Sequence, residues 1–372
     1  MRVLQLGKFY PIRGGVEKVM YDLMLGLAQR GINCDMLCAS TEDYPAGDLV
    51  INSFAKVIIV PTKVKFAATM LAPSMISKLR KIAKDYDIVH IHHPDPMAAL
   101  SLFLAGYKGK VVLHWHSDIL KQKSLLKIYS PLQSWLINRA DIIVGTTPVY
   151  VDRSPFLQHV KQKTDYIPIG INPIVSNSQL VDEIKAKNKG KFLVFSLGRL
   201  VEYKGFEYLI KAAQFLEDNY RIMIGGKGPL HDSLQKLIDD LNLNDRVELL
   251  GFVSDEEAYA YFQACDSFVL SSILKTEAFA IVQIEAMSCA KPIISTDIEA
   301  SGVSWVNKNN VSGINVPVCD EKAIAEALIK LSTDRVFYDR ISKSSLERYE
   351  TLFTRNSMVV RCMCLYDNVL QQ

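Results

Sequence analysis

Two carboxylates eight residues apart stand in KTEAFAIVQIEAMSCAKPIIST, the most chemically specific segment of the sequence. Glu277 precedes an apolar run, and Glu285 lies inside it, in a stretch expected to form a buried helix. A carboxylate among apolar side chains costs free energy unless donors satisfy it, and hydroxyls of a sugar or ribose are suitable donors. Residues 278–282 would also present the amides of a helix N-terminus. The pattern favours a site for a hydroxylated ligand, although a Glu on the exposed side of a helix also fits it.

A pair of cations, Arg199 and Lys204, flanks the loop SLGRLVEYKG directly after an expected strand at residues 192–197. A planar guanidinium and a flexible ammonium at the carboxyl end of a strand suit a diphosphate. A solvated loop with two ordinary cations is the alternative interpretation.

Gly14 and Gly15, in FYPIRGGVEKV, follow the first expected strand and open a helix. Their backbone amides and the helix dipole suit a phosphate, although a plain strand–helix turn fits them as well. The loop is not G-x-G-x-x-G, and no acidic residue marks a ribose site at the usual later strand end, which disfavours a nicotinamide cofactor.

Five of the seven histidines cluster in VHIHHPDP and LHWHSD, each at the end of an expected strand. Imidazole and carboxylate are metal ligands, but the spacing matches no zinc signature. Alternation along a strand places His90 and His92 on one face and His93 on the other. We therefore expect no metal and interpret the cluster as hydrogen-bonding groups at the edge of a cleft, with His116 and Asp118 as the pair of greatest interest.

Short apolar runs alternate with helical patterns along the whole chain, which is typical of buried parallel strands in α/β proteins. The expected strands lie at 3–6, 34–38, 57–60, 88–91, 111–115 and 142–144, and then at 192–197, 221–224, 247–250, 268–270, 292–295 and 313–316. The expected helices lie at 16–30 with Gly31 as C-cap, and at 75–84, 207–216, 230–241, 255–264, 321–331, 335–348 and 356–369. Two such series predict two doubly wound domains, residues 1–170 and 171–355, whose ligands bind in the cleft between them.

Composition excludes several classes of protein. The 372 residues are 49% hydrophobic and 22% charged, which excludes a disordered or repetitive chain. Seven cysteines without a C-x-x-C pair indicate free thiols in a reducing cytoplasm. No apolar run reaches 18 residues, so no membrane span is expected.

Charge is unevenly distributed along the chain. Residues 1–172 carry 21 Lys and Arg against 13 Asp and Glu, which favours an anionic partner. Nucleic acid is disfavoured because no nucleic-acid-binding motif is present. Segments 63–84 and 120–135 combine cations with apolar side chains and suit the surface of an anionic membrane, although ordinary surface helices explain them equally well.

Taken together, these motifs resemble retaining glycosyltransferases of family 4, with the GT-B architecture of two Rossmann-like domains facing each other across a cleft. The resemblance covers nearly the whole chain. Its carriers are Gly14-Gly15, HWHSD at 114–118, IPIGIN at 167–172, GRLVEYKG at 198–205, GGKGPL at 225–230 and the E-x7-E motif from Glu277 to Glu285.

The resemblance implies a role for each matching residue. Arg199 and Lys204 would bind the donor diphosphate, Glu277 would accept hydrogen bonds from the transferred sugar, Glu285 would hold the ribose, and His116 would contact the sugar near the reacting centre. Further donor contacts would come from Gly14, Gly15, Gly228, Phe252, Val253 and the backbone of Phe279, Ala280, Ile281 and Val282. The helix at about 356–372 would pack back on the first domain.

The resemblance also implies a reaction that uses no metal and no cofactor. The sugar would be transferred with retention, so that a nucleotide-α-sugar gives an α-linkage, and the leaving phosphate oxygen would take the acceptor proton. One departure is Ala280, where the family usually has Gly; its methyl group is expected to require a negative φ. Another is Ala290, where the family often has Gly.

The stretches LHWHSDILKQK and SGVSWVN are most similar to bacterial O-antigen mannosyltransferases that use GDP-mannose. That resemblance implies an undecaprenyl-pyrophosphate-linked saccharide acceptor in lipopolysaccharide biosynthesis, a peripheral position at the inner face of the inner membrane, and contact with other glycosyltransferases of the pathway. A UDP-sugar donor stays open, as does a non-catalytic nucleotide-sugar-binding subunit. A UDP-GlcNAc 2-epimerase, a phosphorylase and a His-cluster metallohydrolase are weaker alternatives.

Overall fold

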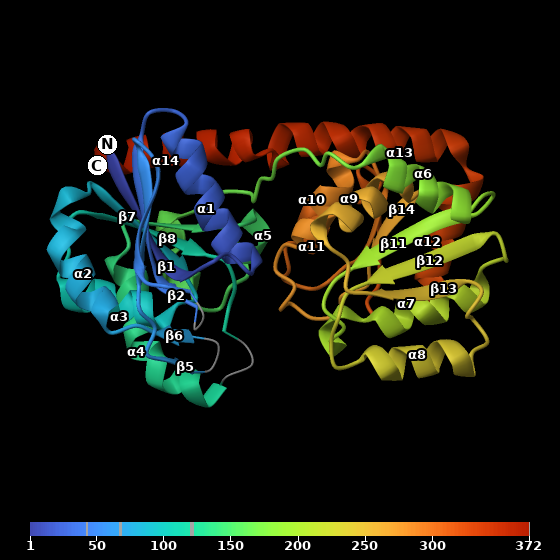
Figure 1. Cartoon of the computed structure of the whole chain (residues 1–372), viewed down its shortest axis with the longest axis horizontal. Helices are drawn as coiled ribbons and strands as arrows, with labels where there is room; N and C mark the ends of the chain where they lie inside the picture. Colours follow the sequence, from blue (N-terminus) through green and yellow to red (C-terminus); the bar gives the residue numbers. More distant parts are fainter. Residues whose placement is uncertain (42–43, 67–68, 120–122, 372) are drawn as a thin grey trace. The chain divides into compact units, whose positions relative to one another are not determined.

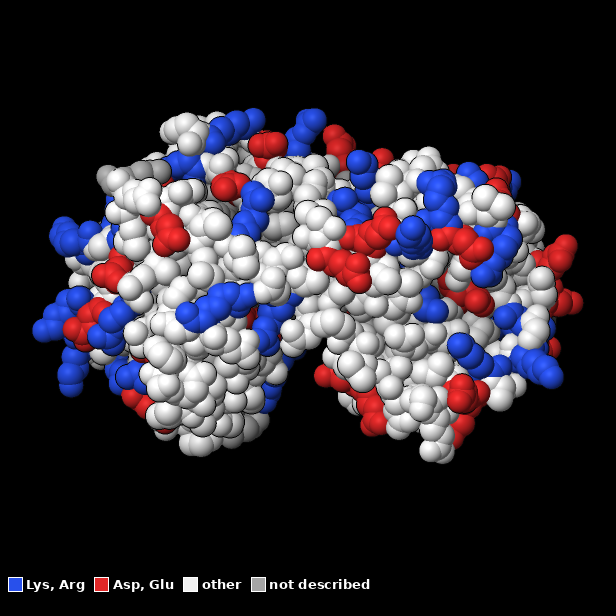
Figure 2. All heavy atoms as spheres, turned by 90° about the horizontal axis from the view of Figure 1, so that it is seen from above, with Lys and Arg blue, Asp and Glu red and all other residues white. Residues whose placement is uncertain are grey.

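The computed structural model describes residues 1–41, 44–66, 69–119 and 123–371, which form two compact units (Figure 1). Unit 1 comprises Met1–Gly170 and Arg355–Gln372, and unit 2 comprises Ile171–Thr354. Unit 1 carries 23 Lys and Arg against 14 Asp and Glu, whereas unit 2 carries 20 against 26. On the face drawn in Figure 2, Lys and Arg are prominent along the left edge, with some Asp and Glu among them, while both signs are mixed over unit 2. Unit 1 is therefore the basic part of the chain.

Unit 1 is built on an eight-stranded sheet in the order β10-β9-β8-β7-β1-β2-β4-β3. The strands are β1 (Arg2–Tyr10), β2 (Asn33–Ser40), β3 (Gly47–Asn52), β4 (Ala55–Val60), β7 (Ile88–His93), β8 (Lys110–Trp115), β9 (Ile142–Gly145) and β10 (Thr164–Tyr166). All neighbours pair in parallel except β3, which is antiparallel to β4. The strand order reverses between β1 and β7, so ligands are expected beyond the carboxyl ends of these two strands.

Helices cover both faces of this sheet. One layer contains α1 (Gly15–Ala28) and α14 (Arg355–Gln371), and the other contains α2 (Ser74–Ile82), α3 (Pro96–Ala105) and α4 (Lys123–Arg139), with α5 (Pro148–Asp152) after β9. A small hairpin, β5 (Val64–Phe66) and β6 (Thr69–Leu71), stands apart from the main sheet. Helix α14 packs closely on α1, because a Cβ added at Gly26 would collide with Val359. The last helix therefore belongs to unit 1, although it follows unit 2 in the sequence.

Unit 2 is built on a six-stranded parallel sheet in the order β13-β12-β11-β14-β15-β16. The strands are β11 (Phe192–Leu197), β12 (Tyr220–Gly225), β13 (Val247–Gly251), β14 (Ser267–Leu270), β15 (Ile293–Thr296) and β16 (Gly313–Val316). Numbered from β11, this is the order 3-2-1-4-5-6 of a Rossmann fold. The order reverses between β11 and β14, which makes the ends of these two strands the expected ligand site.

The helices of unit 2 also form two layers. The helices are α6 (Ser178–Lys187), α7 (Phe206–Ala212), α8 (His231–Asp240), α9 (Asp255–Ala264), α10 (Ile281–Ser288), α11 (Val303–Val306), α12 (Glu321–Thr333) and α13 (Arg335–Arg348). On one face, α7, α8 and α12 pack on the sheet around an apolar core that includes Leu209, Leu234 and Leu328. Burial of these side chains on both faces explains why the central strands are nearly continuous apolar runs.

Helix α1 is followed by Gly31, the residue that the sequence predicts as its C-cap. Gly31 has φ of +75°, its N–H bonds the Ala28 carbonyl, and the Ile32 N–H bonds the Leu27 carbonyl. This is the Schellman arrangement, in which a left-handed residue closes the helix, so the expected role of Gly31 is confirmed. Among the described helices, none combines the length and the apolar character that a bilayer span requires.

Candidate active site

The carboxyl ends of β11 and β14 bring Lys204 and Glu277 together in unit 2. Lys204 ends a short 3-10 turn, Glu202–Lys204, in the loop after β11, and Glu277 lies in the loop after β14. Gly205 follows the turn with φ of +62°, and a Cβ there would collide with the Ser271 carbonyl. The Ser271 hydroxyl in turn donates to the Lys204 carbonyl at 2.9 Å. A glycine at 205 therefore lets the two loops close on each other at the point where the strand order reverses.

The ion pair at this point is nearly buried. Lys204 Nζ lies 2.5 Å from Glu277 Oε2, and each side chain is 11% exposed. The Ser272 hydroxyl donates to the same carboxylate oxygen at 2.9 Å. A buried carboxylate with a cation and a hydroxyl on one oxygen keeps its other oxygen for a ligand hydroxyl.

Arg199 lies on the same loop as Lys204, but its side chain is exposed. Its guanidinium contacts the Tyr203 hydroxyl at 3.5 Å, the outer limit of a hydrogen bond. No ion pair of Arg199 is found among the described residues. The guanidinium is therefore free to bind an anion beside the Lys204–Glu277 pair.

The loops after β11, β12 and β13 pack against one another by their backbones. A Cβ at Gly228 would collide with the Leu200 carbonyl, so a glycine is needed for this close approach. The Leu200 N–H bonds the Lys227 carbonyl at 3.0 Å. Lys227 Nζ lies 5.1 Å from the ring of Phe252, whose side chain is 67% exposed. Phe252 thus offers a free aromatic face, with half-buried Val253 beside it, at the expected place of the base.

The start of α10 corrects one expectation. Ala280 has φ of +62° and ψ of 83° as the N-cap of α10, so the expectation that its methyl group requires a negative φ is wrong. Ala290, after the helix, also has a positive φ of 55°. The surrounding loops hold both residues in a conformation that favours glycine. Phe279 is buried, edge-on to Phe353, whereas Ile281 and Val282 are half-buried.

Helix α10 buries a different polar residue from the one that the sequence suggests. The helix is largely buried, as the sequence predicts, but Glu285 itself is half-buried. Gln283 is fully buried; its amide nitrogen donates to the Phe279 carbonyl at 3.0 Å, and its amide oxygen has no partner among the described residues. Sequence reasoning missed Gln283 because a lone Gln in an apolar helix carries no motif.

In unit 1, Gly14 is the N-cap of α1 and Gly15 is its first residue, and both are exposed. Glu17 covers the same helix end: it is 6% exposed, and a Cβ added at Gly14 would collide with its carboxylate. Burial raises the pKa of Glu17, and the nearby Lys8 ammonium opposes that effect. A carboxylate thus already lies next to Gly14, where the sequence predicts a phosphate. Sequence reasoning missed Glu17, although a Glu at the third helical position is half of a capping box.

His116 lies at the end of β8 and is buried. Its Nε2 shares a hydrogen bond of 2.9 Å with His92 Nδ1, and His92 Nε2 shares one of 2.7 Å with the Gln5 amide oxygen. The expected pairing with Asp118 is not found in these contacts: Asp118 accepts from Trp115 Nε1 at 2.9 Å and from the Ser154 hydroxyl at 2.7 Å. Asp118 thus orders the segment that follows His116.

The remaining histidines divide between the two faces of the sheet, as strand alternation predicts. His90, His92, His114 and His116 stack on one face, whereas the ring of His93 lies 3.7 Å from that of Trp115 on the other. Burial lowers the pKa of all five. These side chains are therefore neutral at pH 7.

Three of these rings, His90, His92 and His114, have nitrogens within 4.8 Å of one another. The rings are stacked, with interplanar angles of 12° to 25° and centroids 4.8 to 5.3 Å apart. Lone pairs of stacked imidazoles lie in parallel planes and do not converge on one point. Both nitrogens of His92 are also engaged, and His90 Nδ1 bonds the Tyr366 hydroxyl. The geometry does not fit a metal centre of the usual tetrahedral kind.

Comparisons with known proteins agree with this geometry. The profile "Glycosyl transferases group 1" matches residues 177–348, and "Glycosyltransferase Family 4" matches residues 13–174. O-antigen chain mannosyltransferase C of Escherichia coli is 33% identical over 100% of this chain and 99% of its own length. D-rhamnosyltransferase WbpZ of Pseudomonas aeruginosa is 30% identical over 95% of this chain and 92% of its own.

A Campylobacter jejuni N-acetylgalactosaminyltransferase, whose named acceptor is a diphospho-undecaprenol saccharide, is 31% identical over 75% of both chains. Among solved structures, Anabaena HepE in complex with UDP has a TM-score of 0.79 at 19% identity, over 99% of this chain and 100% of its own. Two mainly parallel sheets, with both halves of the chain matched to one family, establish the relationship. The protein belongs to the family 4 glycosyltransferases and has the GT-B fold.

Proposed function

We propose that the protein transfers mannose from GDP-mannose to a lipid-linked saccharide, with retention, to form an α-linkage. The observation that carries this proposal is the nearly buried Lys204–Glu277 pair at the strand-order reversal of unit 2. The pair would supply a cation for a diphosphate beside a carboxylate for sugar hydroxyls. The 33% identity to an O-antigen mannosyltransferase along the whole chain supports mannose as the sugar.

The proposed chemistry is electrostatic. The bond between the sugar C1 and the diphosphate oxygen breaks while a bond from C1 to the acceptor oxygen forms on the same face. Lys204 and Arg199 would stabilise the charge on the departing diphosphate, as preorganised cations do in other transferases. The acceptor proton would pass to the leaving phosphate oxygen, so no side chain is assigned as general base. Glu277 would hold the sugar, Glu285 the ribose, and the ring of Phe252 the base.

We also propose that this reaction needs no metal. Arg199 would supply one positive charge, Lys204 a second that it shares with Glu277, and the first turn of α10 backbone amides, next to the place where the diphosphate would lie. These groups would counter part of the charge of the diphosphate, a task that a divalent cation performs in other transferases. The stacked histidines of unit 1 would shape the region near the sugar through His116 rather than bind an ion.

The acceptor would be an undecaprenyl-pyrophosphate-linked saccharide at the inner face of the inner membrane. The acceptor named for the Campylobacter jejuni relative and the excess of cations in unit 1 support this part. A basic surface is attracted to an anionic leaflet. The protein would associate peripherally and work beside other glycosyltransferases of O-antigen synthesis.

A UDP-sugar is the second candidate donor, because the HepE structure of the same fold contains UDP. A thermal-shift screen in EDTA against GDP, GDP-mannose, UDP and UDP-sugars separates the two. A ligand at about 100 times its Kd stabilises a protein by about 2.7 kcal/mol, which is easily measured. Stabilisation by GDP and GDP-mannose alone supports the proposal, followed by transfer of labelled mannose in the same buffer. A response confined to UDP compounds overturns GDP-mannose, and no response to any nucleotide overturns both candidate donors.

A further inference from the structure

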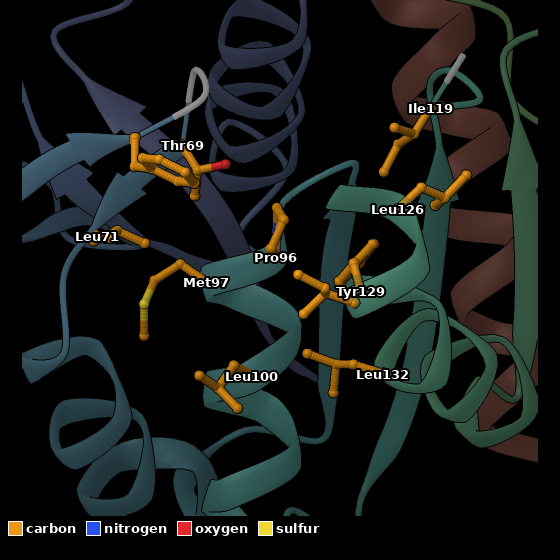
Figure 3. A pocket seen from close by; sticks show the side chains of 11 residues that line it. Thr69, Leu71, Pro96, Met97, Leu100, Ile119, Leu126, Tyr129 and Leu132 are labelled. Carbon is orange, nitrogen blue, oxygen red and sulfur yellow. The ribbon is translucent and has the colours of Figure 1, made fainter. Parts of the chain in front are cut away.

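An apolar cavity of about 290 Å³ lies in unit 1 between the β5–β6 hairpin, α3 and α4 (Figure 3). Its walls include Phe66 and Leu71 of the hairpin, Leu100 of α3, and Leu126, Ile128 and Leu132 of α4. Described residues of both segments that the sequence marks as basic and apolar, 63–84 and 120–135, thus line one cavity. Residues 67–68 and 120–122 of this region lie outside the described residues. None of these walls has a role in the transfer reaction proposed above.

Several walls of the cavity are open to solvent. Ile128 is 80% exposed, Phe66 57% and Leu100 37%. Exposed apolar side chains that surround a hollow mark a binding surface more often than ordinary surface. Tyr129 lines the same cavity, and its buried hydroxyl has no hydrogen-bond partner in the described part of the chain. The cavity therefore combines an open apolar wall with a polar atom that a ligand oxygen would satisfy.

The cavity lies at the reactive edge of unit 1. Pro96, at the start of α3, lines it directly after β7, and Ile119 lines it soon after β8 and His116. Lys8, next to the strand-order reversal, donates from Nζ to the Pro94 carbonyl at 2.6 Å. The Lys8 ammonium thus lies beside Pro94, two residues before the wall residue Pro96, and the Asp95 carboxylate accepts from the Lys8 amide at 2.5 Å.

Cations predominate in the segments that supply the walls of the cavity. The described residues 64–66, 69–84, 96–110 and 126–139 contain nine Lys and Arg and no Asp or Glu, whereas Asp95 and Asp118 adjoin the wall residues Pro96 and Ile119. Lys65 and Lys127 adjoin wall residues and are exposed. A ligand that fits such a site has a hydrocarbon part and an anionic part.

We propose that this cavity binds the first isoprene units of the acceptor's polyprenyl chain, with the adjoining diphosphate facing Lys8. The proposal rests on the proposed function for the identity of the acceptor. The volume lies at the lower end of that of ligand pockets, so the cavity would hold a short piece of chain rather than a whole lipid. Each buried methylene group contributes about four-fold to affinity, so a few of them suffice for discrimination.

The test measures binding of farnesyl diphosphate and of inorganic diphosphate by calorimetry, with excess GDP present to occupy the donor site. We expect farnesyl diphosphate to bind at least about ten-fold more tightly. Leu100→Asp should abolish this preference. Leu104→Asp is the matched control, one helical turn along α3, with 41% exposure against 37% and no place in the cavity wall. It should keep the preference.

A second variant distinguishes loss of the binding site from misfolding of the Leu100→Asp variant. Ile128→Asp changes a side chain that is 80% exposed, so it should fold normally and also lose the preference. Equal binding of the two diphosphates by the wild type would overturn the proposal, as would loss of the preference in Leu104→Asp. The proposal would also be overturned if the cavity variants lost binding to anionic vesicles that contain no prenyl lipid but kept the preference for farnesyl diphosphate. The cavity would then bind the bilayer rather than the acceptor. GDP binding, measured first, tests the proposed function separately.

Discussion

Lys204 and Glu277, 73 residues apart in the sequence, form an ion pair of 2.5 Å in which each side chain is 11% exposed. The loops after β11 and β14 hold the pair, and the Ser272 hydroxyl fixes the shared carboxylate oxygen. A nearly buried pair is costly to break from one side only, because the remaining charge loses its partner without regaining water. The pair therefore links the stability of unit 2 to its proposed chemistry.

The first prediction separates these two roles. Lys204→Met should lower kcat by about 10²–10³-fold, the scale of losing one contact to the transition state. It should also lower the free energy of unfolding by about 2 kcal/mol, less than the roughly 3–5 kcal/mol of a fully buried pair. Adding Glu277→Gln should recover much of that stability without recovering turnover, measured by urea unfolding and a transfer assay.

Lys211→Met is the control for this prediction, because Lys211 lies on α7 of the same unit and is 35% exposed. It should change neither quantity appreciably, since exposed pairs contribute little. Full activity of Lys204→Met would show that Lys204 does not face the diphosphate.

The second prediction concerns Glu277 alone. Glu277→Gln keeps the size of the side chain and removes its charge, so transfer should fall by about 10²-fold or more while GDP binds as before. Calorimetry with GDP and a transfer assay measure the two effects. Loss of GDP binding would instead assign Glu277 to the nucleotide or to the structure of the loop.

The sequence predicts much of the fold because the central strands are buried on both faces. The expected strand at 192–197 coincides with β11, and the expected helix at 255–264 coincides with α9. Helix α3 was missed because PMAALSLFLA is apolar on nearly every side and shows no helical period. The β5–β6 hairpin was missed because three-residue strands are too short to show alternation.

The sequence predicts the residues of the candidate site that belong to recognisable motifs. It does not predict those whose position depends on packing. Lys204 and Glu277 come from recognisable segments, and the structure brings them together. The roles proposed for Arg199, His116 and Glu285 remain predictions. The burial of Glu17 on α1 and of Gln283 on α10 depends on how the helices pack, which the sequence pattern does not show. The conformation of Ala280 was mispredicted because the surrounding loops override the preference of alanine.

The third prediction uses the two left-handed alanines. A non-glycine residue at positive φ destabilises the folded state by about 1–2 kcal/mol. Replacing it with glycine removes this strain but also raises the entropy of the unfolded chain, which offsets about 0.4–1 kcal/mol of the gain. Ala280→Gly and Ala290→Gly should therefore each stabilise unit 2 by up to about 1 kcal/mol. Unfolding in urea, followed by the fluorescence of Trp305, measures the change in this unit.

Ala286→Gly is the matched control for that experiment. Ala286 is fully buried inside α10, where glycine costs about 0.5–1 kcal/mol relative to alanine. The control should thus destabilise the unit while the two test variants stabilise it. If all three variants destabilise unit 2 to the same extent, Ala280 and Ala290 do not have a positive φ in the folded protein.

The fourth prediction follows from the buried histidines of unit 1. Burial lowers the pKa of all five, to about 3 for His93 and His114. In the unfolded chain these groups take up protons near pH 6.5. Their native state is thus favoured above about pH 6.5 and loses stability as the pH falls below it, because the unfolded state then binds more protons. Each histidine contributes up to about 1.4 kcal/mol per pH unit in that range.

Unit 1 should therefore unfold at a higher pH than unit 2, whose single histidine is the partly exposed His231. Trp115 and Trp135 report on unit 1 and Trp305 on unit 2, so variants that keep tryptophan in one unit resolve the two acid transitions by fluorescence. His93→Phe should move the transition of unit 1 to lower pH, because neither nitrogen of His93 has a partner among the described residues and its ring stacks on Trp115. His231→Gln should leave both transitions unchanged. Unfolding of unit 2 before unit 1 on acidification would refute the assignment of the acid-sensitive charge to the stacked histidines.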